Sequence, residues 1–130
     1  MDAVWFGQLS VSAFFAIAFL QSAADKWMDS AGNIEFFRGH FADSPLVGLV
    51  PMMFWTITVL ESLAGVVSGL GAVMILFCKG TGVAVCGVAL STVSLLCLFF
   101  GQRLAKDYAG AAVITSYFVV ALLGFAILAE

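Results

Sequence analysis

A single acidic residue, Glu61, interrupts what would otherwise be one uncharged stretch from residue 44 to residue 78. A carboxylate in so apolar a segment pairs with a cation, binds a polar ligand, passes protons, or stays protonated and fixes helix packing. We interpret Glu61 as the main functional candidate and keep the purely structural role as the alternative.

Candidate partners for this acid lie at the ends of other apolar segments. Lys26 closes the first segment, and Arg103 and Asp107 lie between the third and the fourth. If the segments cross a membrane in alternate directions, these residues lie on the face from which Glu61 is reached. Long cationic side chains can point inward to a buried acid, and Arg103 can also pair with Asp107 four residues later. The predicted ligand-binding or proton-linked residues are Glu61, Lys26, Arg103, Asp25, Asp107 and Gln21, with no catalytic residue assigned.

The elements that carry these residues follow from the charge map of a chain that is 63% hydrophobic and 10% charged. Residues 3–24, 80–102 and 108–129 contain no Asp, Glu, Lys or Arg. Each stretch reaches the roughly 20 residues that cross a hydrocarbon core. We read the two shorter gaps around Glu61 as one further helix. The prediction is an all-α membrane protein, a single domain over residues 1–130 with four transmembrane helices near 3–24, 51–77, 82–101 and 107–129.

Most of the polar sequence lies in residues 25–45. Ile34, Phe37 and Phe41 recur there at helical spacing, with Glu35 and Arg38 between them. This pattern is typical of a short amphipathic helix on the membrane surface, which we predict within residues 30–44. A simple connector that shields the end of the bundle is the alternative.

Small and aromatic residues indicate packing and anchoring. Gly65 and Gly69 have the spacing that lets membrane helices approach closely, so we predict a packing role for both. Trp5, Trp27 and Trp55 fall near expected helix ends, where indole rings anchor helices at the membrane interface.

Several other functions find no support in the residue pattern. Cys78, Cys86 and Cys97 form no CxxC pair, so we expect small residues packed inside the bundle and no metal site. His40 is the only histidine, which leaves no pair of haem ligands. A net charge of −3 without a basic stripe argues against nucleic-acid binding.

Three strings, "FLQSAADKWMD", "VLESLAGVVSGLG" and "GQRLAKDYAGA", together with "GHFADSPL", resemble the DoxX family of small membrane proteins, in particular its branch common in Bacteroidetes. The family-like positions are Lys26, Glu61, Gly65 and Gly69. The family is named for a membrane subunit of a thiosulfate:quinone oxidoreductase, and other members are associated with oxidative-stress complexes. The resemblance therefore implies an integral protein of the bacterial inner membrane, surrounded by lipid and by other membrane subunits. It also implies a quinone or a similar amphipathic ligand near Glu61, with any flavin or iron supplied by a partner.

The sequence leads us to expect a subunit of a redox-linked or quinone-linked membrane complex that is not catalytic alone. Two alternatives remain at this point: a stand-alone small transporter or lipid-binding or solute-binding membrane protein, and a purely structural accessory subunit. Lys26, Arg38, Arg103 and Lys106 lie on one side of the expected bundle and Lys79 on the other. The positive-inside rule then predicts cytoplasmic long turns and external termini.

Overall fold

The computed structural model describes residues 2–130 and confirms an all-α bundle with four membrane-length helices. No strand is present among these residues. In chain order the elements are α1 (Ala3–Met28), α2 (Ser30–His40), a single 3-10 turn η1 (Val47–Leu49), α3 (Val50–Leu76), α4 (Gly82–Leu104) and α5 (Tyr108–Leu128).

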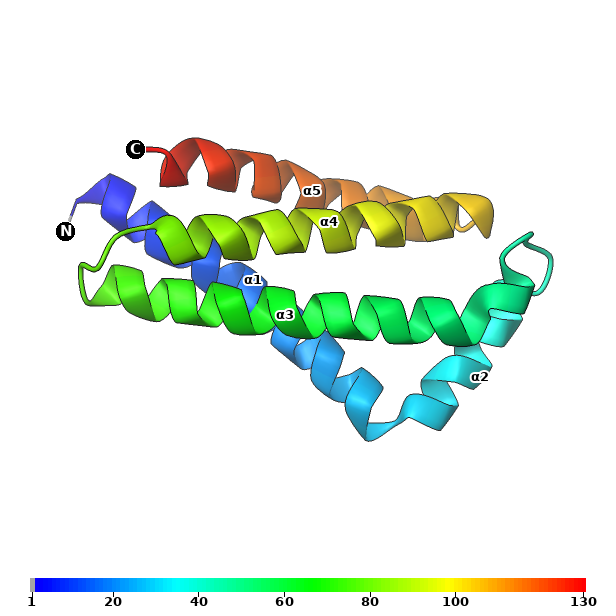
Figure 1. Cartoon of the computed structure of the whole chain (residues 1–130). Helices are drawn as coiled ribbons and strands as arrows, with labels where there is room; N and C mark the ends of the chain where they lie inside the picture. Colours follow the sequence, from blue (N-terminus) through cyan, green and yellow to red (C-terminus); the bar gives the residue numbers. More distant parts are fainter. Residues whose placement is uncertain (1) are drawn as a thin grey trace.

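Helix α3 lies at the centre of the packing, between α1 and α4, while α5 packs mainly on α4 (Figure 1). Helix α1 crosses the bundle obliquely, and its last turns lean away from α4 and α5. The short helix α2 then turns back toward the first turns of α3. Both termini lie at the opposite end of the molecule from α2 (Figure 1).

The helix ends have local causes. The Asp2 carboxylate accepts a hydrogen bond from the Trp5 backbone N–H and caps α1, and Pro51 occupies the first turn of α3, where its missing N–H costs nothing. Asp107 caps α5 in the same way through the Gly110 N–H, at 3.0 Å. Helix α1 continues four residues beyond the expected end at residue 24, because its charged last turn stays helical up to the break at Asp29.

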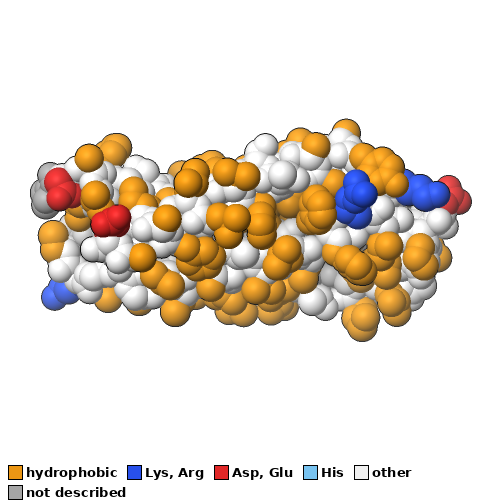
Figure 2. Space-filling model, turned by 90° about the horizontal axis from the view of Figure 1, so that it is seen from above, with side chains coloured by type: hydrophobic (Ala, Val, Ile, Leu, Met, Phe, Trp, Pro, Cys, Tyr) orange, Lys and Arg blue, Asp and Glu red, His pale blue; other side chains and the backbone are white. Residues whose placement is uncertain are grey.

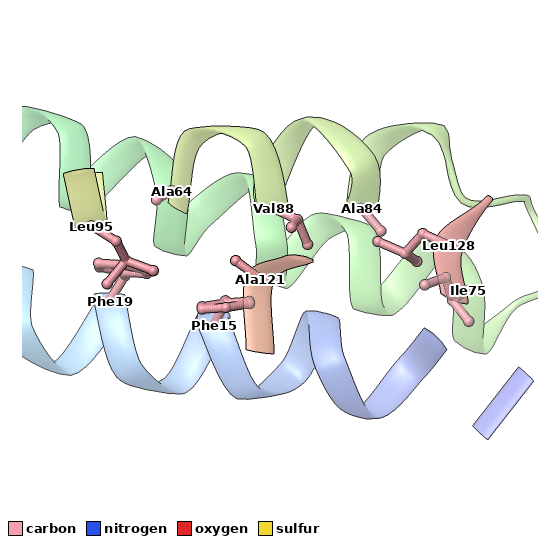
Figure 3. Close-up of a cluster of buried hydrophobic side chains, with 9 residues drawn as sticks. All are labelled: Phe15, Phe19, Ala64, Ile75, Ala84, Val88, Leu95, Ala121 and Leu128. Atoms are coloured by element: carbon pink, nitrogen blue, oxygen red, sulfur yellow. The ribbon is translucent and has the colours of Figure 1, made fainter. Parts of the chain in front are cut away.

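The apolar core runs along the inner faces of α1, α3, α4 and α5 (Figure 3). Phe15 and Phe19 of α1 stack at 6.0 Å between ring centroids and fill the space beside the small residue Ala64 of α3. Helices α3 and α4 approach closely where Gly71 faces Ala84, since a Cβ on Gly71 would lie 2.5 Å from the Ala84 Cα. Small residues thus bring α3 and α4 together, as membrane packing requires.

The outer surface is suited to lipid. The four long helices are long and apolar enough to cross a membrane. Figure 2 shows one face of the molecule, on which acidic and basic side chains gather at the two ends with hydrophobic side chains between them. Exposed residues along the middle of α3 and α5 include Leu63, Leu70 and Leu123. These features indicate a bilayer environment.

Candidate functional site

A buried ion pair joins α1 to α3. Lys26 Nζ lies 2.8 Å from Glu61 Oε1, and the two side chains are 11% and 3% exposed. Glu61 Oε1 has no partner with full hydrogen-bond geometry, so the contact is an ion pair rather than a directed hydrogen bond. Lys26 Nζ also donates to Ser22 Oγ at 2.9 Å. The expected pairing of Glu61 with Lys26 is therefore present in the structure.

Aromatic side chains hold the end of α1 against α3. Trp27 Nε1 donates to Ser62 Oγ at 2.9 Å, and the Trp27 ring lies 5.5 Å from that of Trp55 between centroids. Because Trp27 and Ser62 directly follow Lys26 and Glu61 in the chain, this contact fixes the ion pair in register. Glu61 itself lies eleven residues after Val50, about 16 Å along α3.

The tryptophans also define two levels along the bundle. At the far end, Trp5 Nε1 donates to the carbonyl oxygen of Ile75, at 3.0 Å. Ile75 and Trp55 are twenty residues apart on α3, which is about 30 Å of helix and equals the thickness of a hydrocarbon core. Since tryptophans favour the two interfaces, the Trp27 and Trp55 rings indicate the boundary of one leaflet. Glu61 then lies about 9 Å inside this boundary.

A cavity of about 530 Å³ lies beside the ion pair, covered by α2. Its size falls within the range of roughly 300–1,000 Å³ that holds small-molecule ligands. Lys26 lines it, whereas most of the wall is apolar and comes from α2, η1, the first turns of α3 and the last turns of α4. The apolar lining residues are Phe36, Phe37, Phe41, Leu46, Leu49, Met52, Met53, Ile57, Cys97, Leu98, Phe100 and Gly101.

Helix α2 covers this cavity with its apolar face. Phe37 packs edge-on against Phe54 of α3, with 5.6 Å between ring centroids, and Phe41 is buried. Glu35 and Arg38 on the other face of α2 are exposed. The amphipathic helix predicted within residues 30–44 is present, and its apolar stripe packs on α3.

Polar groups gather at the outer end of the cavity. His40 Nε2 lies 3.5 Å from Asp107 Oδ2, which links the end of α2 to the turn between α4 and α5. Gln102 also lines the cavity, and its amide Oε1 is buried without a hydrogen-bond partner. The lining thus combines a cation from α1 with an uncharged polar residue near the end of α4, within a mostly apolar wall.

Three of the predicted site residues do not join this cluster. Arg103 is exposed, and its guanidinium carbon lies 4.6 Å from the centroid of the Tyr108 ring. The ion pairs found among the described residues join Lys26 to Glu61 and His40 to Asp107 and do not include Arg103. Gln21 and Asp25 are also exposed. All three share an end of the bundle with Glu61, but helix rotation turns their side chains outward.

The packing predictions have a mixed outcome. A Cβ on Gly65 would lie 2.8 Å from the Leu20 backbone nitrogen, so close approach at Gly65 is confirmed. The nearest atom to a Cβ on Gly69 is 3.8 Å away, an ordinary contact, so Gly69 is not required there. The cysteines were expected inside the bundle, yet Cys78, Cys86 and Cys97 are all exposed, and Cys97 is among the residues that line the cavity.

Sequence reasoning missed Gln102 and His40 as cavity residues. Gln102 stands next to Arg103, and a helix turns by about 100° per residue, so only the rotation of α4 decides which of the two faces inward. The only sequence signal for Gln102 is an uncharged polar residue at the end of a hydrophobic helix. The position of His40 at the cavity depends on how α2 folds back onto α3, and the local sequence of α2 does not determine this.

Comparison of the chain with family models, with curated proteins and with solved structures found no match.

Proposed function

We propose that this protein is an integral membrane subunit that binds an amphipathic small molecule, such as a quinone head group, in the cavity beneath α2. The observation that carries this proposal is the cavity itself, about 530 Å³ with a mostly apolar wall and the Lys26 ammonium at its inner end. Small-molecule sites are commonly apolar concavities with a few placed polar groups. A quinone carbonyl oxygen is an acceptor that could receive a hydrogen bond from Lys26.

The surroundings of the cavity favour a ligand that comes from the bilayer. Phe36, Met52 and Phe100 line the cavity and are also strongly exposed, at 66%, 60% and 61%. The boundary level set by Trp27 and Trp55 lies beside the same part of α3. An amphipathic molecule could therefore enter with its apolar part still in contact with lipid.

The redox-linked complex is the broader part of the proposal, and its support is the resemblance to the DoxX family. In this proposal the chain binds and positions the ligand, and electron transfer takes place on cofactors held by a partner subunit. Localisation in a bacterial inner membrane belongs to the same inference. The long apolar helices support a membrane location in general.

The test is a pull-down of the tagged protein from native membranes, with mass spectrometry of both partner proteins and extracted small molecules. Met53→Trp should fill the cavity and abolish recovery of the ligand, whereas Leu70→Trp on the exposed face of α3 should not. Equal recovery from both variants would refute the cavity as the binding site.

The same experiment separates the other two functions. Recovery of the chain alone with a bound solute would favour a stand-alone transporter or solute-binding protein. Recovery of a stable complex without any small molecule would favour a structural accessory subunit.

A further inference from the structure

We propose that Glu61 sets the charge selectivity of the cavity beneath α2, so that the site admits uncharged amphiphiles and rejects anionic ones. This inference rests on the proposed function and specifies the class of ligand. In it, Glu61 acts through Lys26 as a positioning residue, since Lys26 lines the cavity and Glu61 lies behind it.

Lys26 lines the cavity beneath α2 with its ammonium group paired to Glu61. An ammonium group has three N–H donors. Lys26 Nζ donates one hydrogen bond, to Ser22 Oγ at 2.9 Å, while Glu61 Oε1 lies 2.8 Å away as an ion-pair partner without hydrogen-bond geometry. Even if one further donor points toward Glu61, at least one is left for a ligand. The positive charge is already balanced by the carboxylate, so the remaining donor offers a hydrogen bond without a net charge. A carbonyl, ester or hydroxyl oxygen can accept it.

The cavity presents a ligand with no net positive charge. Among the described lining residues, charge is carried by Lys26, His40 and Asp107. Lys26 is balanced by Glu61, and His40 faces Asp107 at 3.5 Å. The total charge of these two pairs is zero when His40 is protonated and negative when His40 is neutral. An anionic head group would therefore find no net positive charge in either state, and like charges brought together at low dielectric are costly.

Gln102 is an uncharged polar residue of the cavity lining. The buried Oε1 of Gln102 has no partner, and a buried polar atom without a hydrogen bond is unfavourable. An amide can present either its oxygen or its NH₂ group after rotation, so it can match a donor or an acceptor. A ligand with an uncharged polar group near each end of an apolar body can accept from Lys26 and, once the Gln102 side chain turns toward the cavity, pair with the Gln102 amide.

The experiment uses the full chain in phosphatidylcholine nanodiscs and two single-chain probes in equimolar competition. Monododecanoylglycerol is uncharged, and dodecylsulfonate stays anionic. Native mass spectrometry of the released protein gives the ratio in which the two probes are bound. We expect the wild type to favour the glyceride by about tenfold or more.

Substitution of Glu61 gives the decisive result. Glu61→Gln removes the balancing charge and should shift the ratio toward the sulfonate by at least about tenfold, whereas Glu61→Asp should keep the wild-type preference. Glu35→Gln makes the same chemical change on the exposed face of α2 and should leave the ratio unchanged. A loss of packing alone would weaken the binding of both probes and would not reverse the preference between them.

Each result decides something. A wild-type protein that holds the sulfonate as well as the glyceride would overturn the selectivity, and this test needs no variant to fold. An unchanged ratio in a folded Glu61→Gln protein would overturn the role of Glu61. If the wild type also fails to bind decylubiquinone and both probes, the proposed function falls together with this inference.

Discussion

Removal of Lys26 should destabilise the bundle more than any exposed charge substitution. At 2.8 Å and an effective dielectric constant of about 20, two unit charges attract by roughly 6 kcal/mol. Most of that attraction offsets the loss of hydration of the two groups. Breaking a buried pair by removing one partner costs about 3–5 kcal/mol, because the other charge remains buried alone. Lys26→Met keeps the length of the side chain, so we expect a loss in this range.

The assay is unfolding in mixed micelles with increasing dodecyl sulfate, followed by far-ultraviolet circular dichroism. Glu61→Gln and the double variant complete a thermodynamic cycle. The double variant should be more stable than Lys26→Met alone, because no uncompensated charge remains. Lys106→Met removes an exposed cation from the same end and should change the free energy of unfolding by less than about 0.5 kcal/mol.

Additivity would refute this reasoning. If the losses of the two single variants sum to that of the double variant within about 0.5 kcal/mol, the side chains do not interact in the folded protein. A loss for Lys26→Met no larger than that for Lys106→Met would lead to the same conclusion.

Two further predictions concern helix packing and a helix cap. Gly65→Ala should lower the free energy of unfolding by about 1–3 kcal/mol in the same assay, because its Cβ would lie 2.8 Å from the Leu20 backbone. Gly69→Ala should leave the free energy of unfolding unchanged or raise it by up to about 1 kcal/mol. Equal effects of the two substitutions would contradict this packing. The Trp5 backbone N–H lowers the pKa of Asp2 below its ordinary value. The contribution of the Asp2 cap to the stability of the folded protein should therefore be fully present above about pH 4. It should disappear as the pH falls through the lower pKa that Asp2 has in the folded state. The amide proton shift of Trp5 should follow that titration in detergent solution, and a shift that does not change there would argue against the cap.

The ion pair between Lys26 and Glu61 could be anticipated because hydropathy and connectivity follow directly from the order of residues along the chain. Charge-free stretches give the number of membrane helices, alternate crossings place helix ends on one side, and a buried acid requires a partner. None of these steps depends on how a helix is rotated. The predicted pairing with Glu61 is therefore found for Lys26, whose side chain reaches into the bundle.

Rotation and tilt explain the failures. Arg103 and Gln102 are adjacent in the sequence and lie at the same end of the bundle, yet only Gln102 faces the cavity. The tilt of α1 and the return of α2 decide that His40 meets Asp107, and both depend on contacts among several helices. A single sequence contains the polar residues of the site but not the directions in which they point.

The order of the spans has a consequence for biosynthesis. Lys26 and Glu61 belong to α1 and α3, the first two long helices to be made, and chains are synthesised and begin to fold from the N-terminus. The pair can close as soon as α3 enters the membrane, so neither charge has to wait in lipid for α4 or α5. The buried residues of α5 are Ala111, Ala121, Gly124 and Leu128, all of them apolar. The last helix to be inserted therefore adds packing to a site whose charges have already met.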